Sequence, residues 1–287
     1  MRRLRSILGG VRRAHALWTV GALATFALLV SGGVLVATVQ EADIRSWWLV
    51  AAAVMALAIA TGSVALFHRF YSQEAQRQQL ALVSIRPLLG KLPVPVMPEG
   101  WWVDPVFSQL LVQLLVELRP KVVLECGSGS STVLLAACLE EMQQGLVVSL
   151  EEDPPWAIRT ERLLRERGLE HRARVIPAPL GPVSQGDLKV RDWYTLPEDS
   201  DWLPGPVDLL VVDGPSTARH PEARLPAVAV LRPHLHAQTV IVMDDGKRPG
   251  ERRVARSWGR DLRVTPVYKR EGKGSWILSL TPRRLPI

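Results

Sequence analysis

Four of the five apolar strands that the sequence predicts after residue 99 end in acidic residues. VDLLVV leads into Asp213, VIVM leads into the pair Asp244-Asp245, and VVSL leads into Glu151. The fourth acid, Glu125, is the second-last residue of KVVLEC, and the small-residue loop GSGSST follows this strand directly. Carboxylates that gather in one place repel each other unless a cation or hydrogen-bond donors balance them. The pattern therefore predicts a binding site at which these acids meet a ligand or an ion.

The loop that follows Glu125 is typical of a site where a nucleotide-like ligand approaches the backbone. A dinucleotide-binding motif has the form GxGxxG, with an acid about 20 residues further on. Glu151 lies 22 residues after Gly129 and fits that acid, but Thr132 stands where the third glycine is expected. Glu125 lies two residues before Gly127, where it would repel a pyrophosphate. The loop therefore favours a cationic ligand over a dinucleotide.

The elements that carry these residues alternate between strand and helix from about residue 99 onwards. Apolar strands that alternate with helices indicate a parallel sheet that is covered on both faces. Ligands of such sheets bind beyond the carboxyl ends of the strands, so we expect the acids to lie along one edge. A final hairpin adds an antiparallel strand at or near one side of the sheet. The predicted strands lie in residues 121–126, 146–153, 172–180, 207–215 and 238–246, and the hairpin spans 263–282.

Four motifs taken in order, VLECGSGSST, VVSLEED, VDLLVVDGP and VIVMDDG, resemble the class I S-adenosylmethionine-dependent methyltransferases. The resemblance covers about residues 99–287 and is strongest to a bacterial group, distantly similar to the catechol-type O-methyltransferases. It implies an α/β fold with a Rossmann-like sheet of order 3-2-1-4-5-7-6, in which strand seven is antiparallel. It also implies S-adenosylmethionine as the cofactor. The residues implied to contact that cofactor are Glu125, Gly127, Gly129, Ser130, Ser131, Thr132, Glu151, Ala178 and Asp213.

The same resemblance implies a metal site. In the catechol-type relatives an acid after strand four and an acidic pair after strand five hold Mg²⁺, which corresponds here to Asp213, Asp244 and Asp245. Three oxygen ligands suit such an ion, and it would acidify an acceptor hydroxyl. The structural alternative is that Asp244 and Asp245 cap the next helix or pair with the arginines at 248, 252 and 253.

The sequence departs from these relatives at two positions that bear on catalysis. The relatives have Asp-Asn where this chain has Asp-Asp, and they have a lysine where this chain has Ser216. Lys247 or His220 is therefore the expected base, beside Asp213 at the methyl-transfer centre. Methyl transfer needs alignment of the two reactants more than a catalytic triad, and the histidines show no triad spacing.

Two uncharged segments, residues 18–39 and 47–67, precede this domain. Each has the ~20 apolar residues that a helix needs to cross a bilayer, and the short spacer QEADIRS predicts a transmembrane hairpin. Arginines flank both outer ends, so the positive-inside rule places both termini and the catalytic domain in the cytoplasm. A cleaved signal peptide and two buried core helices are the rival interpretations.

These features divide the chain into a membrane anchor at 1–67, a helical stalk with a Pro-rich linker at 68–98, and a methyltransferase domain at 99–287. Residues 18–90 offer a surface for pairing with a second copy. The net charge of +7 raises the possibility of nucleic-acid binding, but the densest basic cluster precedes the first span, so nucleic acid is not expected. Two cysteines without a motif predict neither a disulfide framework nor a zinc site.

The segment 181–206 interrupts the alternation of strands and helices and contains three aromatic residues, Trp193, Tyr194 and Trp202. They would either cover an acceptor or anchor the loop to the sheet. The leading functional hypothesis is a membrane-anchored methyltransferase that acts on an oxygen of a small-molecule or lipid-linked acceptor at the cytoplasmic face. The alternatives are a non-catalytic membrane adaptor that retains the fold and a nicotinamide-dependent oxidoreductase.

Overall fold

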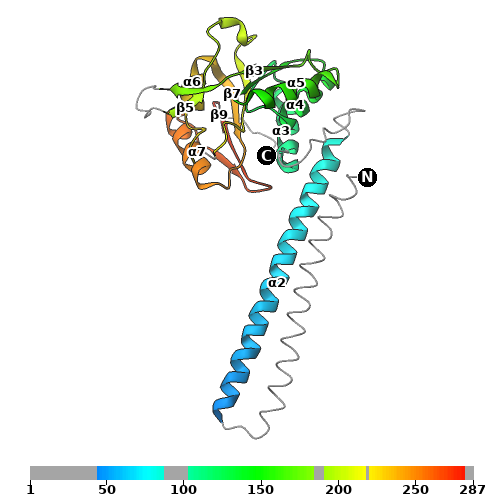
Figure 1. Cartoon of the computed structure of the whole chain (residues 1–287), viewed down its shortest axis with the longest axis vertical. Coiled ribbons are helices and arrows are strands. Elements are labelled where there is room, and N and C mark those ends of the chain that lie inside the picture. Colours follow the sequence, from blue (N-terminus) through cyan, green and yellow to red (C-terminus); the bar gives the residue numbers. More distant parts are fainter. Residues whose placement is uncertain (1–43, 87–102, 184–190, 218–219, 282–287) are drawn as a thin grey trace. The chain divides into compact units, whose positions relative to one another are not determined.

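The computed structural model describes residues 44–86, 103–183, 191–217 and 220–281 (Figure 1). The chain divides into two units, residues 1–75 and 76–287, and each is described by itself. The second unit contains the predicted catalytic domain.

A single long helix, α2 (Ile44–Ile85), dominates the described part of the first unit and continues into the second. From Ala51 to Ile85 it is long and apolar enough to cross a membrane, by length and composition alone. The predicted span 47–67 is therefore helical, and the predicted stalk begins as a continuation of the same helix. The predicted span 18–39 and the linker at 91–98 lie outside the described residues.

Seven strands form one mixed sheet in the second unit, and its order is β3-β2-β1-β6-β7-β9-β8. The first five strands are parallel, β9 is antiparallel to β7, and β8 is antiparallel to β9. This confirms the predicted strand order and its antiparallel strand. The strands are β1 (Val122–Cys126), β2 (Leu146–Glu151), β3 (Ala173–Pro177), β6 (Val207–Val212), β7 (Leu235–Met243), β8 (Val267–Lys269) and β9 (Ser275–Ser279).

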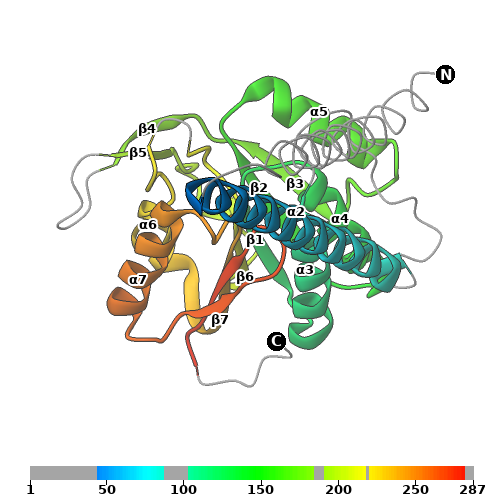
Figure 2. The ribbon, with the colours of Figure 1, turned by 90° about the horizontal axis from the view of Figure 1, so that it is seen from below.

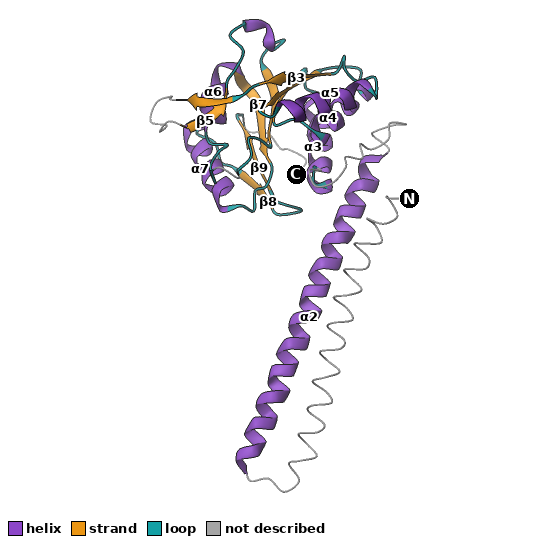
Figure 3. Ribbon diagram, in the orientation of Figure 1, coloured by secondary structure: helices purple, strands orange, loops and turns teal. Residues whose placement is uncertain are grey.

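Helices cover both faces of this sheet (Figures 2 and 3). Alternate residues of each strand point to opposite faces, so Val123 of β1 packs with one set of helices while Leu124 packs with the other. The first set is α3 (Pro105–Leu118), α4 (Ser130–Glu141) and α5 (Pro154–Arg165), and the second is α6 (Pro226–Leu231) and α7 (Pro249–Leu262). Burial on both faces explains why the strand sequences are apolar throughout.

The insertion between β3 and β6 forms a small antiparallel sheet of β4 (Leu180–Val183) and β5 (Arg191–Tyr194), followed by a short 3₁₀ turn, η3 (Ser200–Trp202). Trp193 and Tyr194 are almost completely buried, and Trp202 is 7% exposed. All three belong to the core cluster on the face of the sheet that α6 and α7 cover. These three aromatic side chains therefore pack into the core, which favours the anchoring role over covering an acceptor.

Candidate cofactor-binding site

A cleft of about 660 Å³ lies at the carboxyl ends of the central strands. The loops after β1, β2, β6 and β7 contribute to its walls, as expected for an open parallel sheet. Residues far apart in the sequence, from Val103 to Lys273, therefore meet there. The lining consists of Val103, Gly127 to Ser131, Glu151 to Asp153, Trp156, Asp213, Gly214, Ser216, Thr217, Arg224, Asp245, Arg248 and Lys273.

The glycine loop lies directly against the loop that follows β6. A Cβ atom on Gly127, whose φ is +90°, would lie 3.0 Å from the backbone nitrogen of Gly214. The N–H groups of Asp213 and Gly214 both donate to the carbonyl oxygen of Cys126, at 3.0 and 2.6 Å. Glycine is needed at position 127 because of both its backbone angle and this close approach. The two loops therefore form one continuous wall of the cleft.

Glu125 lies beneath the glycine loop and does not line the cleft. It is completely buried, and its Oε2 accepts hydrogen bonds from the hydroxyls of Thr132 and Ser149, at 2.5 and 2.8 Å. Burial raises the pKa of Glu125 to about 7, although these hydroxyls partly oppose the rise. The Thr132 hydroxyl also accepts the N–H of Gly129 at 2.9 Å. Glu125 and Thr132 therefore support the loop from behind.

Glu151 lines the cleft at the end of β2 and holds the glycine loop from the other side. Its Oε2 accepts from both the N–H and the hydroxyl of Ser128, each at 2.7 Å, and its Oε1 accepts from the N–H of Asp153 at 3.1 Å. The side chain is 5% exposed, and burial raises its pKa despite these bonds. Trp156 completes this wall, since its Nε1 donates to the carbonyl oxygen of Ser128 at 2.7 Å.

Glu152 connects the floor of the cleft to the insertion. Its Oε2 accepts the Tyr194 hydroxyl at 2.9 Å, and its Oε1 lies 3.4 Å from the backbone nitrogen of Ser216. Burial, followed by the charge of Glu152, raises the pKa of Tyr194 well above its ordinary value, so the phenol stays neutral. The insertion therefore reaches the site through this hydrogen bond.

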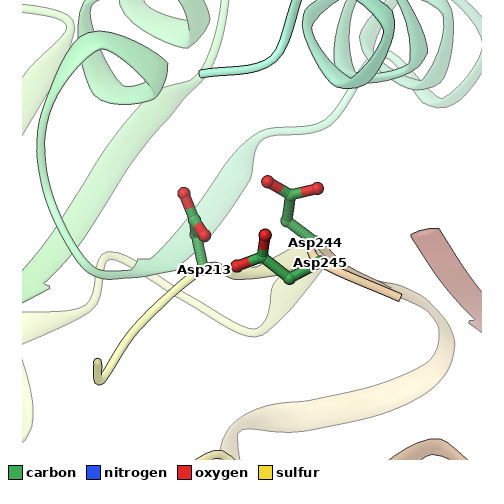
Figure 4. A group of neighbouring side chains, drawn as sticks. All are labelled: Asp213, Asp244 and Asp245. Atoms are coloured by element: carbon green, nitrogen blue, oxygen red, sulfur yellow. The ribbon is translucent and has the colours of Figure 1, made fainter. Parts of the chain in front are cut away.

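Asp213, Asp244 and Asp245 converge at the ends of β6 and β7 (Figure 4). One carboxylate oxygen of each lies within 4.8 Å of the others, so the structure brings together the three predicted metal ligands. The side chain of Asp213 is 32% exposed, whereas Asp244 and Asp245 are buried. Burial and then the charges of Asp213 and Asp245 raise the pKa of Asp244 well above its ordinary value.

Two arginines contact this acidic cluster. Nη2 of the buried Arg224 lies 3.2 Å from Oδ1 of Asp213 and 3.3 Å from Oδ2 of Asp245. Nη1 of Arg248 lies 2.8 Å from the same Oδ2 of Asp245. The pairing with Arg248 was one of the structural alternatives expected for the acidic pair, whereas Arg224 had not been expected there.

The remaining predicted residues do not line the cleft. Lys247 donates from Nζ to the carbonyl oxygen of Gly272 at 2.5 Å. His220 accepts the N–H of Glu222 on Nδ1 at 3.0 Å, and Ala178 is buried in the core of the sheet. Of the three predicted catalytic residues, Asp213 is the one that faces the cleft.

Residues 124–246 match a protein-family model that is described as a methyltransferase domain. No curated protein sequence matches the chain. Among solved structures, the chain is similar to the methyltransferase PaMTH1 of Podospora anserina, with 15% identity, a TM-score of 0.48, and coverage of 70% of this chain and 88% of that one.

The O-methyltransferase from Bacillus cereus has 17% identity and a TM-score of 0.44, with coverage of 69% of this chain and 90% of that one. The O-methyltransferase TomG from Streptomyces achromogenes also has 17% identity and a TM-score of 0.44, with coverage of 71% and 89%. The part of the chain that forms most of the cleft, from β1 to the loop after β7, therefore matches the sequence pattern of a methyltransferase domain.

Proposed function

We propose that the protein is an S-adenosylmethionine-dependent methyltransferase. The observation that carries this proposal is the joint position of the glycine loop and Glu151 in one cleft, within a segment that matches a methyltransferase domain. The loop admits a ligand close to its backbone, and the acid stands at the end of the neighbouring strand.

The hydrogen bonds of Glu151 leave room for a ribose. An ionised carboxylate has about four acceptor positions on its two oxygens. Ser128 occupies two of them on Oε2, and Asp153 occupies one on Oε1. One position on Oε1 therefore remains for a ribose hydroxyl. Ser130 and Ser131 also line the cleft at the N-terminus of α4, where hydroxyls and backbone N–H groups can bind a carboxylate.

The chemistry expected of the protein is modest. S-adenosylmethionine supplies a methyl group that is already activated, so the site has to align the acceptor and exclude water. Asp213 lies in the wall of the cleft with a partly exposed carboxylate, and Arg224 holds that carboxylate in place. We assign to Asp213 the role of orienting an acceptor hydroxyl and accepting its proton, which makes O-methylation the expected reaction.

We further propose that the enzyme is anchored in the cell membrane by helices at about 18–39 and 47–67, with both termini and the catalytic domain in the cytoplasm. The arginines that flank these segments support this orientation. An anchored enzyme suits a small-molecule or lipid-linked acceptor at the cytoplasmic face. A homo-oligomer formed through residues 18–90 also remains a prediction. Mg²⁺ at the acidic cluster is the other cofactor expected from the sequence, and the two arginines that contact the cluster argue against it.

The experiment that tests this function is calorimetric titration of the full chain in detergent micelles with S-adenosylmethionine and, separately, with NAD. We expect binding of the first ligand only. Binding of NAD alone would replace the proposal with the oxidoreductase, and binding of neither would favour the non-catalytic adaptor. If S-adenosylmethionine binds, transfer of a radiolabelled methyl group to a membrane extract of the source cell then identifies the acceptor.

A further inference from the structure

A buried guanidinium lies at the centre of the acidic cluster. Besides its contacts with Asp213 and Asp245, Arg224 donates from Nη1 to the carbonyl oxygen of Asp244 at 3.0 Å and lies 3.5 Å from Oε1 of Glu251. Its Nη2 also contacts the carbonyl oxygen of Asp213. The residue is 2% exposed. One cation thus contacts the carboxylates of two predicted metal ligands, Asp213 and Asp245, the main-chain carbonyl of the third, Asp244, and a fourth acid.

The turn that carries Arg224 is held by helix α7. A Cβ atom on Gly250 would lie 1.9 Å from the carbonyl oxygen of Pro221, so the start of α7 packs directly on this turn. Trp258, which is fully buried in α7, donates from Nε1 to the carbonyl oxygen of Leu225 at 2.9 Å. Because these contacts lie on both sides of Arg224, the guanidinium is part of the packed interior and cannot easily move out.

The donor set therefore does not fit a divalent ion well. A carboxylate oxygen that binds Mg²⁺ lies about 2.0–2.1 Å from it. The oxygens of Asp213 and Asp245 are already hydrogen-bonded to Arg224, so an ion bound to them would lie close to a guanidinium that does not lose its proton in proteins. Arg248 adds a second positive charge at Asp245. The like charges would repel the ion.

We propose that Arg224 is the internal cation of this cluster and that the site works without a divalent metal ion. Arg224 orients the carboxylates of Asp213 and Asp245, and its positive charge lies at the wall of the cleft where an acceptor oxygen becomes negative. A fixed positive charge at that place favours the ionised form of the acceptor hydroxyl, which is the nucleophile, as a bound metal ion would. The catalytic part of this inference rests on the proposed methyltransferase function, whereas the charge arrangement does not.

The test uses Mn²⁺ as a probe of the full chain in detergent micelles, with the free ion followed by electron paramagnetic resonance. The matched control is Asp213→Ala, which removes one of the three ligands at a partly exposed position. We expect the wild type and Asp213→Ala to bind Mn²⁺ equally weakly. One equivalent of Mn²⁺ bound by the wild type and lost in Asp213→Ala would overturn the proposal.

A second variant tests whether the guanidinium of Arg224 prevents Mn²⁺ from binding. Arg224→Gln removes the charge, and we expect it to bind Mn²⁺ at least tenfold more tightly than the wild type, whereas Arg224→Lys should not. A folded Arg224→Gln protein without this gain would contradict the proposal. If Arg224→Gln fails to fold, as judged by near-ultraviolet circular dichroism, the wild-type comparison alone decides.

Titration with S-adenosylmethionine in the presence and absence of EDTA separates this inference from the proposed function. Equal affinity in both conditions agrees with a metal-free site, and affinity that requires metal contradicts it. Failure to bind S-adenosylmethionine under either condition would refute the proposed function, while the Mn²⁺ measurements would still decide whether Arg224 replaces a metal ion.

Discussion

The hydroxyl oxygen of Thr132 lies 2.5 Å from Oε2 of Glu125, and both side chains are completely buried. The same hydroxyl accepts the backbone N–H of Gly129, so it joins the glycine loop to strand β1 from within. This explains why threonine stands where a dinucleotide-binding loop would have its third glycine. Thr132, whose place in the sequence argues against a dinucleotide ligand, therefore supports the glycine loop in the structure.

Replacing Thr132 with valine is expected to destabilise the protein. Valine keeps the branched shape but leaves the N–H of Gly129 without its partner and removes one of the two hydroxyls that donate to Glu125, and each such loss costs about 1–3 kcal/mol. We expect the free energy of unfolding to fall by about 2–4 kcal/mol, measured by urea denaturation of the full chain in detergent micelles. Thr132→Ser keeps the hydroxyl and serves as the control. Equal losses in the two variants would contradict the role of the hydroxyl.

Replacing Glu151 with glutamine is expected to weaken cofactor binding. The amide offers only one acceptor oxygen, so it cannot accept from Ser128, Asp153 and a ribose as the carboxylate does. Hydrogen bonds to charged groups contribute about 1.5–3 kcal/mol, so the dissociation constant for S-adenosylmethionine should rise about 10- to 100-fold. Calorimetry measures the change, and Glu166→Gln on the surface of the same unit is the control. Unchanged affinity in Glu151→Gln would place the ribose elsewhere.

Replacing Glu251 with glutamine is expected to change how stability depends on pH. Burial raises the pKa of this carboxyl from 4.5 to about 7 in the folded protein, although Arg224 and Arg248 oppose the rise. Between these two values the folded state binds more protons than the unfolded state, so stability is lost as the pH rises from about 4.5 to about 7. The variant has no proton to lose at this position.

The difference in unfolding free energy between the Glu251→Gln variant and the wild type should therefore grow in favour of the variant across this pH range. Its upper limit is about 3 kcal/mol, since each unit of pKa shift corresponds to about 1.4 kcal/mol. Urea denaturation at pH 4.5, 5.5, 6.5 and 7.5 measures it, and Glu166→Gln should show no such trend. A difference that stays constant with pH would mean that Glu251 ionises normally.

Replacing Trp193 with alanine tests whether the insertion is anchored or covers an acceptor. Trp193 is completely buried in the core, so its removal should cost about 3–5 kcal/mol of unfolding free energy. Affinity for S-adenosylmethionine should remain within about threefold, because Trp193 does not line the cleft. Val116→Ala, at a position 53% exposed on α3, is the control and should change stability by less than about 0.5 kcal/mol. A stable Trp193→Ala protein would contradict the anchoring role.

Much of the sheet could be predicted because its local signals agree. The central strands are apolar throughout and the segments between them have helical spacing, so the parallel core follows from pattern alone. The resemblance implies the strand order, and the terminal hairpin by itself already predicts an antiparallel strand; the structure confirms both. The insertion could not be assigned, because an aromatic residue in a loop has the same signature whether it packs inward or lines a site.

The sequence predicted which residues meet at the site, but it did not predict how their charges are balanced. The motifs indicated that Gly127, Gly129, Glu151 and Asp213 lie at one edge of the sheet, and all four line the cleft in the structure. Glu125 has the same local pattern, yet it lies behind the loop, and burial depends on contacts that no short motif records. Arg224 gave no signal, because it lies in the segment HPEARLP before α6 and reaches the acidic cluster only through the packing of α7.

The position of β9 between β7 and β8 has a consequence for synthesis. The chain is made with its N-terminal part first, so a chain whose synthesis stops before Ser275 contains β6 and β7 without β9. In such a chain one side of β7 has no partner, and its residues Val240 to Met243 are ones that the complete fold buries. An unpaired apolar strand edge readily joins another chain. Incompletely synthesised chains that lack β9 should therefore aggregate more readily than the complete protein.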